Sequence, residues 1–284
     1  MKWIIGILYI LLFIVIASYT LRYFSNLLEL VYFNSTPTSF LLLLFLIGAV
    51  FAANKGIKSI SYVNLLFFPI ILLSLIIILF STLKDIVPQR IFPILGFGAY
   101  KTFISGFTNI FTFGSITYLY FLMPILKNPE DYKKVAISSI IISGIYIFFS
   151  VLCLSMVFPY AAFTDDTLSM YLLTRRISFG KFFQRIDAMF ILFWILSVLV
   201  FLSMNLHFAN NIIKKLTNIK CDKELNYSIA FIIFSIALYY NSIAQMEYVL
   251  NVYIKYAFIG LCLVLSFIIM FLAYLKNKKE NYNV

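Results

Sequence analysis

Residues 59–83 read SISYVNLLFFPIILLSLIIILFSTL, a stretch of 25 residues without one charged side chain. A helix of about 20 apolar residues crosses the ~30 Å hydrocarbon core of a bilayer. Seven further stretches of 19 to 30 residues are equally free of charge: Trp3–Leu21, Leu30–Asn54, Thr102–Leu126, Val135–Thr164, Ala188–Ile213, Leu225–Met246 and Tyr256–Leu275. Eight stretches of this length predict a polytopic helical membrane protein.

The composition excludes a water-soluble domain and a membrane β-barrel. Hydrophobic residues make up 63% of the 284 residues and charged residues 12%, whereas a soluble domain has about a quarter of its residues charged. Strands of a spanning barrel alternate apolar and polar residues, but Ile70–Phe80 is apolar on both faces. Because backbone polar groups in lipid must be paired internally, the predicted fold is an all-α transmembrane bundle of eight spans.

The chain is expected to form one membrane domain over residues 1–284, since it has no Gly/Ser-rich linker and no soluble segment of useful size. The spans are expected at about 3–24, 37–54, 60–81, 104–126, 135–158, 187–211, 226–241 and 252–275. The first is interpreted as a retained span rather than a cleaved signal peptide, because its apolar run exceeds the roughly 7–15 residues of a signal peptide.

The net charge of +11 is concentrated at the ends of the spans. Short Lys-rich connections occur at Asn54–Lys58, Lys127–Lys134, Lys214–Glu224 and Lys276–Glu280. Short loops rich in Lys and Arg stay on the cytoplasmic side, so both termini of this cell-membrane protein are expected in the cytoplasm. The expected partner of this charge is the lipid bilayer and not nucleic acid, because the basic residues do not gather on one helical face.

Residues that carry enzyme chemistry are scarce. The chain has one histidine, His207, and three scattered cysteines, so we expect no metal site, no cofactor and no catalytic residues. Charges inside a bilayer usually mark ion paths, but Arg22, Asp187 and Lys255 all fall at the ends of expected spans. The sequence therefore predicts neither an enzyme nor a buried carboxylate for ion coupling.

The fourth span carries the strongest candidate site. Residues 102–117 read TFISGFTNIFTFGSIT, in which two glycines and many hydroxyl and amide side chains interrupt an apolar helix. Discontinuous helices expose backbone groups near the midplane that can hold small polar ligands. The candidate ligand-binding residues are Gly106, Thr108, Asn109, Phe113, Gly114, Ser115 and Thr117. Close helix packing through small residues explains the same pattern, and both interpretations stay open.

Two further features lie in and before the sixth span. Trp194 and Ser197 are three residues apart and share a helical face, which suits an amino-acid side-chain pocket or ordinary packing. The preceding segment, Thr164–Ile186, has acids at its start and then an amphipathic stretch. It is either a short interfacial helix or a lid over an outward-facing cavity.

Motifs along the chain match one known family. They are KWI (2–4), KGI (55–57), FTFG (111–114), FLMP (121–124) and FFQRIDAMF (182–190), with Trp194 following. On these residues essentially the whole chain resembles the spore germination permeases, the B subunits of endospore germinant receptors. That family belongs to the amino acid–polyamine–organocation superfamily.

The resemblance implies a fold of ten core helices in two inverted five-helix repeats, in which the eight spans correspond to helices three to ten. The fourth span then becomes the broken helix of the second repeat. The first two helices, one of which supplies half of the family's binding site, are expected to be absent. Where the family often carries a carboxylate after the Phe-Gly of the broken helix, this chain has Ser115.

The resemblance also implies a function. We expect a membrane sensor that binds a small germinant, an amino acid, and signals to a membrane-associated A subunit and a lipoprotein C subunit in the spore inner membrane. Asp187 is expected to position the outer segment rather than to contact the ligand. An amino-acid transporter working by alternating access is the alternative, and a structural remnant that binds nothing is a third possibility.

Overall fold

The structure, a computed structural model, describes residues 2–96, 98–126, 128, 130–159, 169–177, 186–219, 223–240, 242–268, 271 and 275. Every regular element in these ranges is helical, which confirms the predicted all-α class. Six long helices make up the body of the protein: α1 (Lys2–Val31), α2 (Thr38–Asn54), α3 (Gly56–Ser81), α6 (Asp131–Val157), α9 (Ile186–Thr217) and α10 (Lys223–Tyr239).

Shorter helical segments connect or extend the long helices. The 3₁₀ segments η1 (Leu83–Asp85) and η2 (Pro88–Ile91) follow α3, and α8 (Ser169–Arg176) precedes α9. Between η2 and α6 lie α4 (Ala99–Thr108), η3 (Asn109–Phe113), α5 (Ile116–Leu122) and η4 (Met123–Ile125). After α10 come α11 (Ile243–Val249), the π-helical η5 (Leu250–Ile254), α12 (Lys255–Phe258) and the π-helical η6 (Ile259–Val264).

Five helices of the described chain are long and apolar enough to cross a bilayer, judged by length and composition: Lys2–Val31, Gly56–Asp85, Asp131–Val157, Asp187–Thr217 and Ile243–Ile268. Helices α2 and α10 have 17 residues each, which gives about 25 Å of helix. The fourth expected span is divided into short segments. The eight expected spans thus comprise five full-length candidates, two short helices and one interrupted segment.

Two of the long helices turn apolar side chains towards their surroundings rather than towards a core. On α3, Leu65 is 71% exposed and Phe80 is 69% exposed, and on α6 Phe148 is 61% exposed. Apolar surface on this scale marks contact with lipid or with another protein. Helices pair their backbone groups internally, so an apolar outer face suits hydrocarbon as the surrounding solvent.

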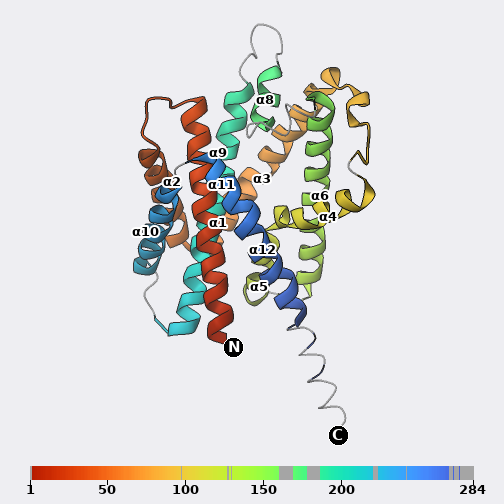
Figure 1. The fold of residues 1–284 in the computed structure, drawn as a ribbon. Helices are drawn as coiled ribbons and strands as arrows, with labels where there is room; N and C mark the ends of the chain where they lie inside the picture. The colour runs from red at the N-terminus through yellow and green to blue at the C-terminus, as the bar shows by residue number, and fades with distance from the viewer. Residues whose placement is uncertain are drawn as a thin grey trace.

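The main core lies where α1, α2, α9 and α10 meet. Ala17 on α1, Ala49 on α2 and Ala237 on α10 are fully buried, and residues this small let helix backbones approach one another. Figure 1 shows α1 in front of α9, with α2 and α10 beside them. Because α1 also contacts α11 and η5, the N-terminal helix packs against the last long helix, Ile243–Ile268, which α11, η5, α12 and η6 form together.

A chain of amides joins three of these helices. Asn226 Nδ2 on α10 donates to Asn54 Oδ1 on α2 over 2.8 Å, and Asn210 Nδ2 on α9 donates to Asn226 Oδ1 over 2.7 Å. Asn226 is 2% exposed. Polar side chains that bond across helices hold bundles together in lipid. Asn226 therefore links α2 to α9.

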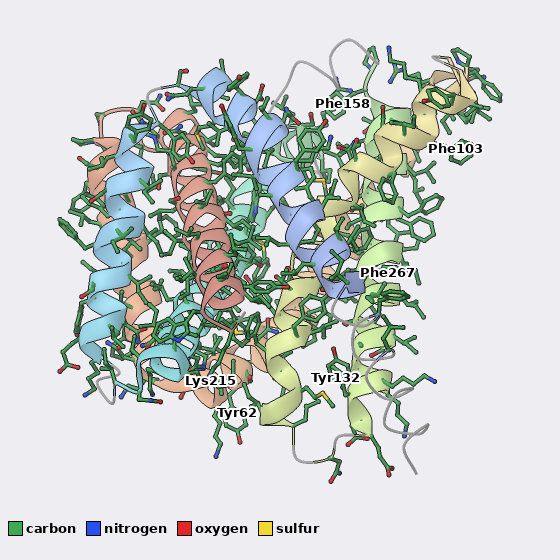
Figure 2. The ribbon with its side chains drawn as sticks, turned by 60° about the horizontal axis from the view of Figure 1, so that its bottom comes forward. Tyr62, Phe103, Tyr132, Phe158, Lys215 and Phe267 are labelled. Carbon is green, nitrogen blue, oxygen red and sulfur yellow. The ribbon has the colours of Figure 1, made fainter. Side chains whose placement is uncertain are left out.

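The described parts of the first three Lys-rich connections lie towards one end of the bundle. Figure 2 shows Tyr62, Tyr132 and Lys215 towards that end, and Phe103 and Phe158 towards the other. Each of the first three residues lies in or next to one of the Lys-rich connections. We refer to this side as the Lys-rich end.

The last long helix corrects the expectation for Lys255. The sequence placed this residue at the outer end of a span over residues 252–275, but it lies halfway along the helix Ile243–Ile268. Ser242 caps that helix by accepting a hydrogen bond from the Gln245 backbone N–H at 3.2 Å. The expected boundary at residue 252 was taken from a charge-free run that the lysine itself interrupts, and it stays a prediction.

The outer segment before α9 is described in part. Residues 160–168 and 178–185 lie outside the described residues, whereas α8 between them is helical. Tyr171, Leu173 and Thr174 of α8 are buried, and Leu173 packs in a cluster with residues of α3 and α6. Helix α8 therefore packs against the bundle. The interfacial-helix and lid hypotheses both extend into residues that the structure does not describe.

Replacing Asn226 with alanine should destabilise the bundle, because the Asn54 acceptor and the Asn210 donor lose their partner. The expected loss is about 0.6–1.7 kcal/mol of unfolding free energy, the range found for hydrogen bonds between membrane helices. Thermal unfolding in detergent measures it. The matched control is Ser228→Ala at an exposed position of the same helix, and an equally large effect of the control would contradict the linking role of Asn226.

Candidate ligand-binding site

The fourth apolar stretch is interrupted where its sequence indicated a break. The 3₁₀ segment η3 follows α4 directly, and a turn at Gly114 and Ser115 precedes α5. A Cβ on Gly114 would lie 3.0 Å from the Phe111 carbonyl oxygen, so the turn favours a residue without a side chain. Figure 1 shows α4 lying across the bundle, whereas α6 and α1 run along it.

Hydroxyl groups satisfy backbone carbonyls around the break. Three threonine Oγ1 atoms donate to carbonyl oxygens three residues earlier: Thr108 to Ser105 at 3.1 Å, Thr112 to Asn109 at 2.8 Å and Thr117 to Gly114 at 2.7 Å. An interrupted helix at membrane depth needs such partners. The hydroxyl protons of Thr108 and Thr117 are therefore used inside the segment, and these groups can only accept from a ligand.

A cavity of about 190 Å³ lies against this turn, and we call it the central cavity. Its wall includes Ile16 and Tyr19 of α1, Tyr118 of α5, Asn205 of α9 and Ile254 of η5. Sites for drug-sized ligands measure about 300–1,000 Å³. The central cavity is smaller, so it suits a molecule of amino-acid size.

The central cavity lies at mid-depth of the bundle. Ile16 is near the midpoint of Lys2–Val31, Phe201 is near the midpoint of Ile186–Thr217, and Ile254 is near the midpoint of Ile243–Ile268. Three independent helices thus place the cavity at the same level. Transporter folds bind small solutes at this level, beside discontinuous helices.

Asn205 gives the cavity wall an unused hydrogen-bond acceptor. Its Nδ2 donates to the Tyr118 hydroxyl and to the Phe201 carbonyl, both at 2.8 Å. The carbonyl can only accept, so it fixes which end of the amide is the nitrogen. Asn205 Oδ1 is buried and has no hydrogen-bond partner among the described residues. Such an unpaired acceptor costs about 1–3 kcal/mol, and a donor from a ligand would recover this energy.

The structure brings only part of the predicted site to this cavity. Gly114, Ser115 and Thr117 line it. Asn109 lies beside it, where its Oδ1 accepts a hydrogen bond from Lys255 Nζ at 2.7 Å. Phe113 instead points towards α6, because a Cβ on Gly144 would lie 4.0 Å from its ring.

The remaining predicted residues lie apart from the cavity. Gly106 and Thr108 belong to α4, in which no residue is buried. Trp194 packs against Phe24 and Phe190, with ring centroids 5.4 and 5.3 Å away. Ser197 bonds back to its own helix and lies eight residues before Asn205, about 12 Å along α9. The shared face of Trp194 and Ser197 is therefore used in packing.

The sequence did not predict the residues that helices other than the fourth span contribute to the wall of the central cavity. Tyr118 and Phe201 look like ordinary apolar helix residues, and nothing in their spacing points to a site. Asn205 and Lys255 did carry a signal, since an amide and a charge are each rare inside apolar helices. Their position opposite the broken helix becomes visible only in three dimensions.

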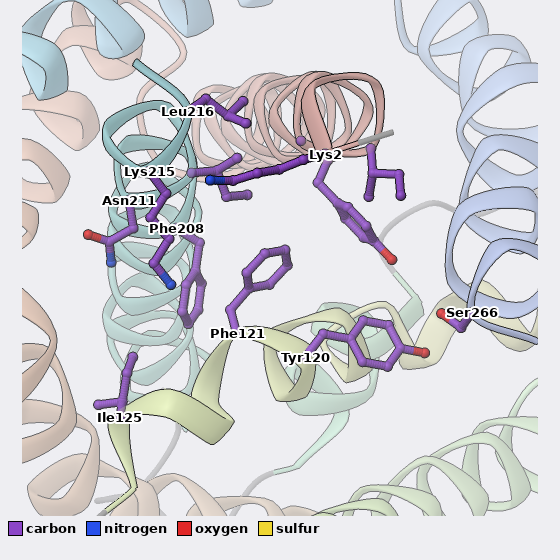
Figure 3. Close-up of a pocket in the computed structure, with 13 residues that line it drawn as sticks. Lys2, Tyr120, Phe121, Ile125, Phe208, Asn211, Lys215, Leu216 and Ser266 are labelled. Carbon is purple, nitrogen blue, oxygen red and sulfur yellow. The ribbon is translucent and has the colours of Figure 1, made fainter. Parts of the chain in front are cut away.

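A second, larger cavity of about 930 Å³ opens towards the Lys-rich end. Figure 3 shows Lys2 of α1 and Lys215 of α9 at one edge, with Tyr120 and Ser266 across from them. Its volume is several times that of the central cavity. It is too wide to enclose a single small solute, so we do not identify it as the ligand site.

A layer of aromatic rings joins the walls of the two cavities. Phe13 and Tyr118 line the central cavity, and Phe121 and Phe208 line the larger one. Tyr118 stacks on Phe208 with centroids 5.2 Å apart, and Phe13 lies 5.6 Å from Phe121. We call these four residues the aromatic layer. It lies on the path from the central cavity to the Lys-rich end.

Asp187 makes the contacts expected of a residue that positions the outer segment. Its Oδ2 accepts from Tyr32 Oη at 3.0 Å and from Tyr171 Oη of α8 at 3.5 Å. Asp187 is 7% exposed and does not line the central cavity. Burial, and next the hydrogen bond to Asp187, raises the pKa of Tyr32 to about 12. The phenol therefore stays protonated and donates at physiological pH.

Comparisons with known proteins agree with this picture. The profile of the spore permease family, described as "Spore germination protein", matches residues 1–246. Spore germination protein KB of Bacillus subtilis (strain 168) is 25% identical over 286 residues, covering 99% of this chain and 77% of that protein. Spore germination protein B2 of the same strain is 26% identical over 141 residues, covering 49% of this chain and 38% of the relative. No solved structure matches the chain.

Apolar helices of spanning length and a solute-sized cavity at a broken helix define a multi-pass membrane protein of permease type. The chain belongs to the spore germination protein family. The family resemblance seen in the sequence motifs is thereby confirmed.

Replacing Asp187 with alanine should loosen α8, because two tyrosine donors lose their acceptor. The expected loss is about 1.5–3 kcal/mol of unfolding free energy, typical of hydrogen bonds to a charged group. The pKa of Tyr32 rises from 10.0 to about 12 in the folded state. The hydrogen bond from Tyr32 to Asp187 therefore contributes fully to the free energy of unfolding below pH 10. This contribution is lost as the pH rises from 10 to 12.

Thermal unfolding in detergent at pH 7 measures the loss. The control is Glu224→Ala, an exposed acid in the first turn of α10. If both variants unfold at the same temperature, Asp187 does not hold the outer segment.

Proposed function

We propose that this chain is a membrane subunit of a spore germinant receptor that senses a small germinant, an amino acid, to trigger germination. The observation that carries the proposal is the central cavity of about 190 Å³ at the broken helix, with the unpaired Asn205 Oδ1 in its wall. The family and the names of the two curated relatives supply the biological setting.

The proposal includes all eight expected spans and the inverted-repeat fold. Helices α2 and α10 would cross a locally thinned part of the bilayer, since a span shorter than the hydrocarbon core is accommodated by local thinning. The Lys-rich end would face the cytoplasm, which places both termini there. The partners would be a membrane-associated A subunit and a lipoprotein C subunit of the receptor.

Sensing needs an element whose position a ligand can change. A ligand in the central cavity would contact α1 and α9 on one side and the turn at Gly114 and Ser115 on the other. No residue of α4 is buried, so the broken segment is held less firmly than its neighbours. A ligand that binds one position of this segment better than another shifts the population towards it.

An amino-acid transporter working by alternating access is the second candidate. It is favoured by the broken helix at mid-depth, which is typical of secondary transporters, and by the permease name of the family. The aromatic layer favours the sensor, because it lies between the central cavity and the Lys-rich end. Uptake into liposomes distinguishes the two, since a sensor binds its ligand without accumulating it.

Binding should be lost when the central cavity is filled. In the full chain produced with its receptor subunits, Ser115→Leu is expected to abolish binding of a radiolabelled mixture of L-amino acids. The side chain of Ser115 makes no capping hydrogen bond to α5, so the fold should tolerate the change. Ser266→Leu, which lines the larger cavity, is the matched control and should bind as the unchanged protein does. Absence of binding by the unchanged receptor, or loss only in the control, overturns the proposal.

Site-directed labelling tests the orientation. In a cysteine-free background, Ser35→Cys should react with a membrane-impermeant maleimide in intact cells, because it lies in the connection opposite the Lys-rich end. Lys58→Cys should react only after the membrane is permeabilised. The reverse pattern would show that the Lys-rich end faces outwards.

A further inference from the structure

Lys255 is a charged residue where a bilayer tolerates charge least. It lies halfway along Ile243–Ile268, one of the five helices of spanning length. An ionisable residue near the bilayer centre is costly and usually faces a cavity or a partner inside the bundle. Contacts with surrounding residues or with a ligand have to offset this free-energy cost.

The helix around Lys255 is locally widened. The π-helical η5 ends directly before it, and the π-helical η6 begins four residues later. Single π-turns inside α-helices occur frequently at functional sites. Here they flank the one turn of α-helix that carries the ammonium.

The contacts that the described residues give this ammonium are neutral. Lys255 Nζ donates to Asn109 Oδ1 at 2.7 Å and lies 5.9 Å from the centre of the Phe111 ring. Both partners belong to η3, the segment that breaks the fourth span. An amide oxygen and an aromatic face orient a cation, but neither neutralises its charge.

Lys255 and Asn109 do not themselves line the central cavity, but both lie next to residues that do. Phe111, which the ammonium faces, and Ile254, which precedes Lys255, both line the cavity. Asn205 also lines this cavity, and its buried Oδ1 has no hydrogen-bond partner among the described residues. The site thus offers a cation to an anionic group and an acceptor to an N–H donor.

We infer that Lys255 binds the carboxylate of the ligand, so that the cavity selects small α-amino or other N–H-bearing carboxylic acids. The carboxylate would replace or join Asn109 as the acceptor of Lys255, while the ligand's amino group donates to Asn205 Oδ1. A charge-assisted pair of this kind is stronger than the amide contact present without a ligand. The inference rests on the proposed function and names the class of ligand that its site accepts.

The test compares acids with their amides. Binding of L-alanine, L-valine and L-leucine is measured beside binding of their C-terminal amides, for the receptor containing the full chain. The amides keep the shape and the amino group but lack the carboxylate. The unchanged protein should prefer an acid to its amide by about 10- to 100-fold, the effect of one charge-assisted hydrogen bond.

Two variants assign that preference to Lys255. Lys255→Met keeps the length of the side chain and should remove the preference by weakening the acid alone, so that amide binding reports an intact fold. Asn109→Asp should also weaken binding of the acid, because the new carboxylate would form an ion pair with the Lys255 ammonium. Lys255→Arg should retain the preference, and Lys134→Met, an exposed lysine at the start of α6, should have no effect.

The outcomes separate the two proposals. If the unchanged protein binds neither acids nor amides, the amino-acid sensor is wrong and this inference is overturned with it. If acids and amides bind equally, or if Lys255→Met weakens both to the same extent, the sensor stands. The assignment of Lys255 to the carboxylate is then overturned.

Discussion

Every backbone N–H and C=O group at membrane depth needs a partner, and this requirement governs the whole structure. Unbroken helices meet it alone, which explains why α3 and α6 can expose Leu65 and Phe148 so widely. The segment from α4 to α5 cannot meet it through an unbroken helix. It adds threonine hydroxyls of its own, such as Thr117, and its turn lies against α1, α9 and the helix Ile243–Ile268. The break and the cavity therefore have one cause.

Polar residues inside the bundle divide into two groups by the state of their hydrogen bonds. Asn226 and Asp187 bond to side chains on two other elements each, and they hold helices together. Asn205 and Lys255 keep an unpaired acceptor and an uncompensated charge beside the same small cavity. Arg22 Nε and Ser25 Oγ are also buried without a hydrogen-bond partner among the described residues, but neither residue lines the central cavity. The site is therefore distinguished by an unpaired acceptor and a charge that lie close to one cavity.

The sequence predicted the all-α class, the apolar helices and the break near Gly114, because hydrophobic length and small-residue clusters depend only on local order. It did not predict Lys255 inside the helix Ile243–Ile268, since a charge-free run ends at every charged residue, including one within a helix. For Trp194 and Ser197 it left a pocket and ordinary packing open, and their contacts in the structure agree with packing. Tyr118 and Asn205 meet across 87 positions of sequence, a contact that no periodicity encodes.

The aromatic layer has a consequence for the movement of any solute between the two cavities. Phe13, Tyr118 and Phe208 come from three different helices and lie in mutual contact, so no single side-chain rotation opens a route for solute. Permeation would require those helices to part together. Truncating one ring would instead remove its contacts with the other two rings. One layer of stacked rings thus separates the two cavities.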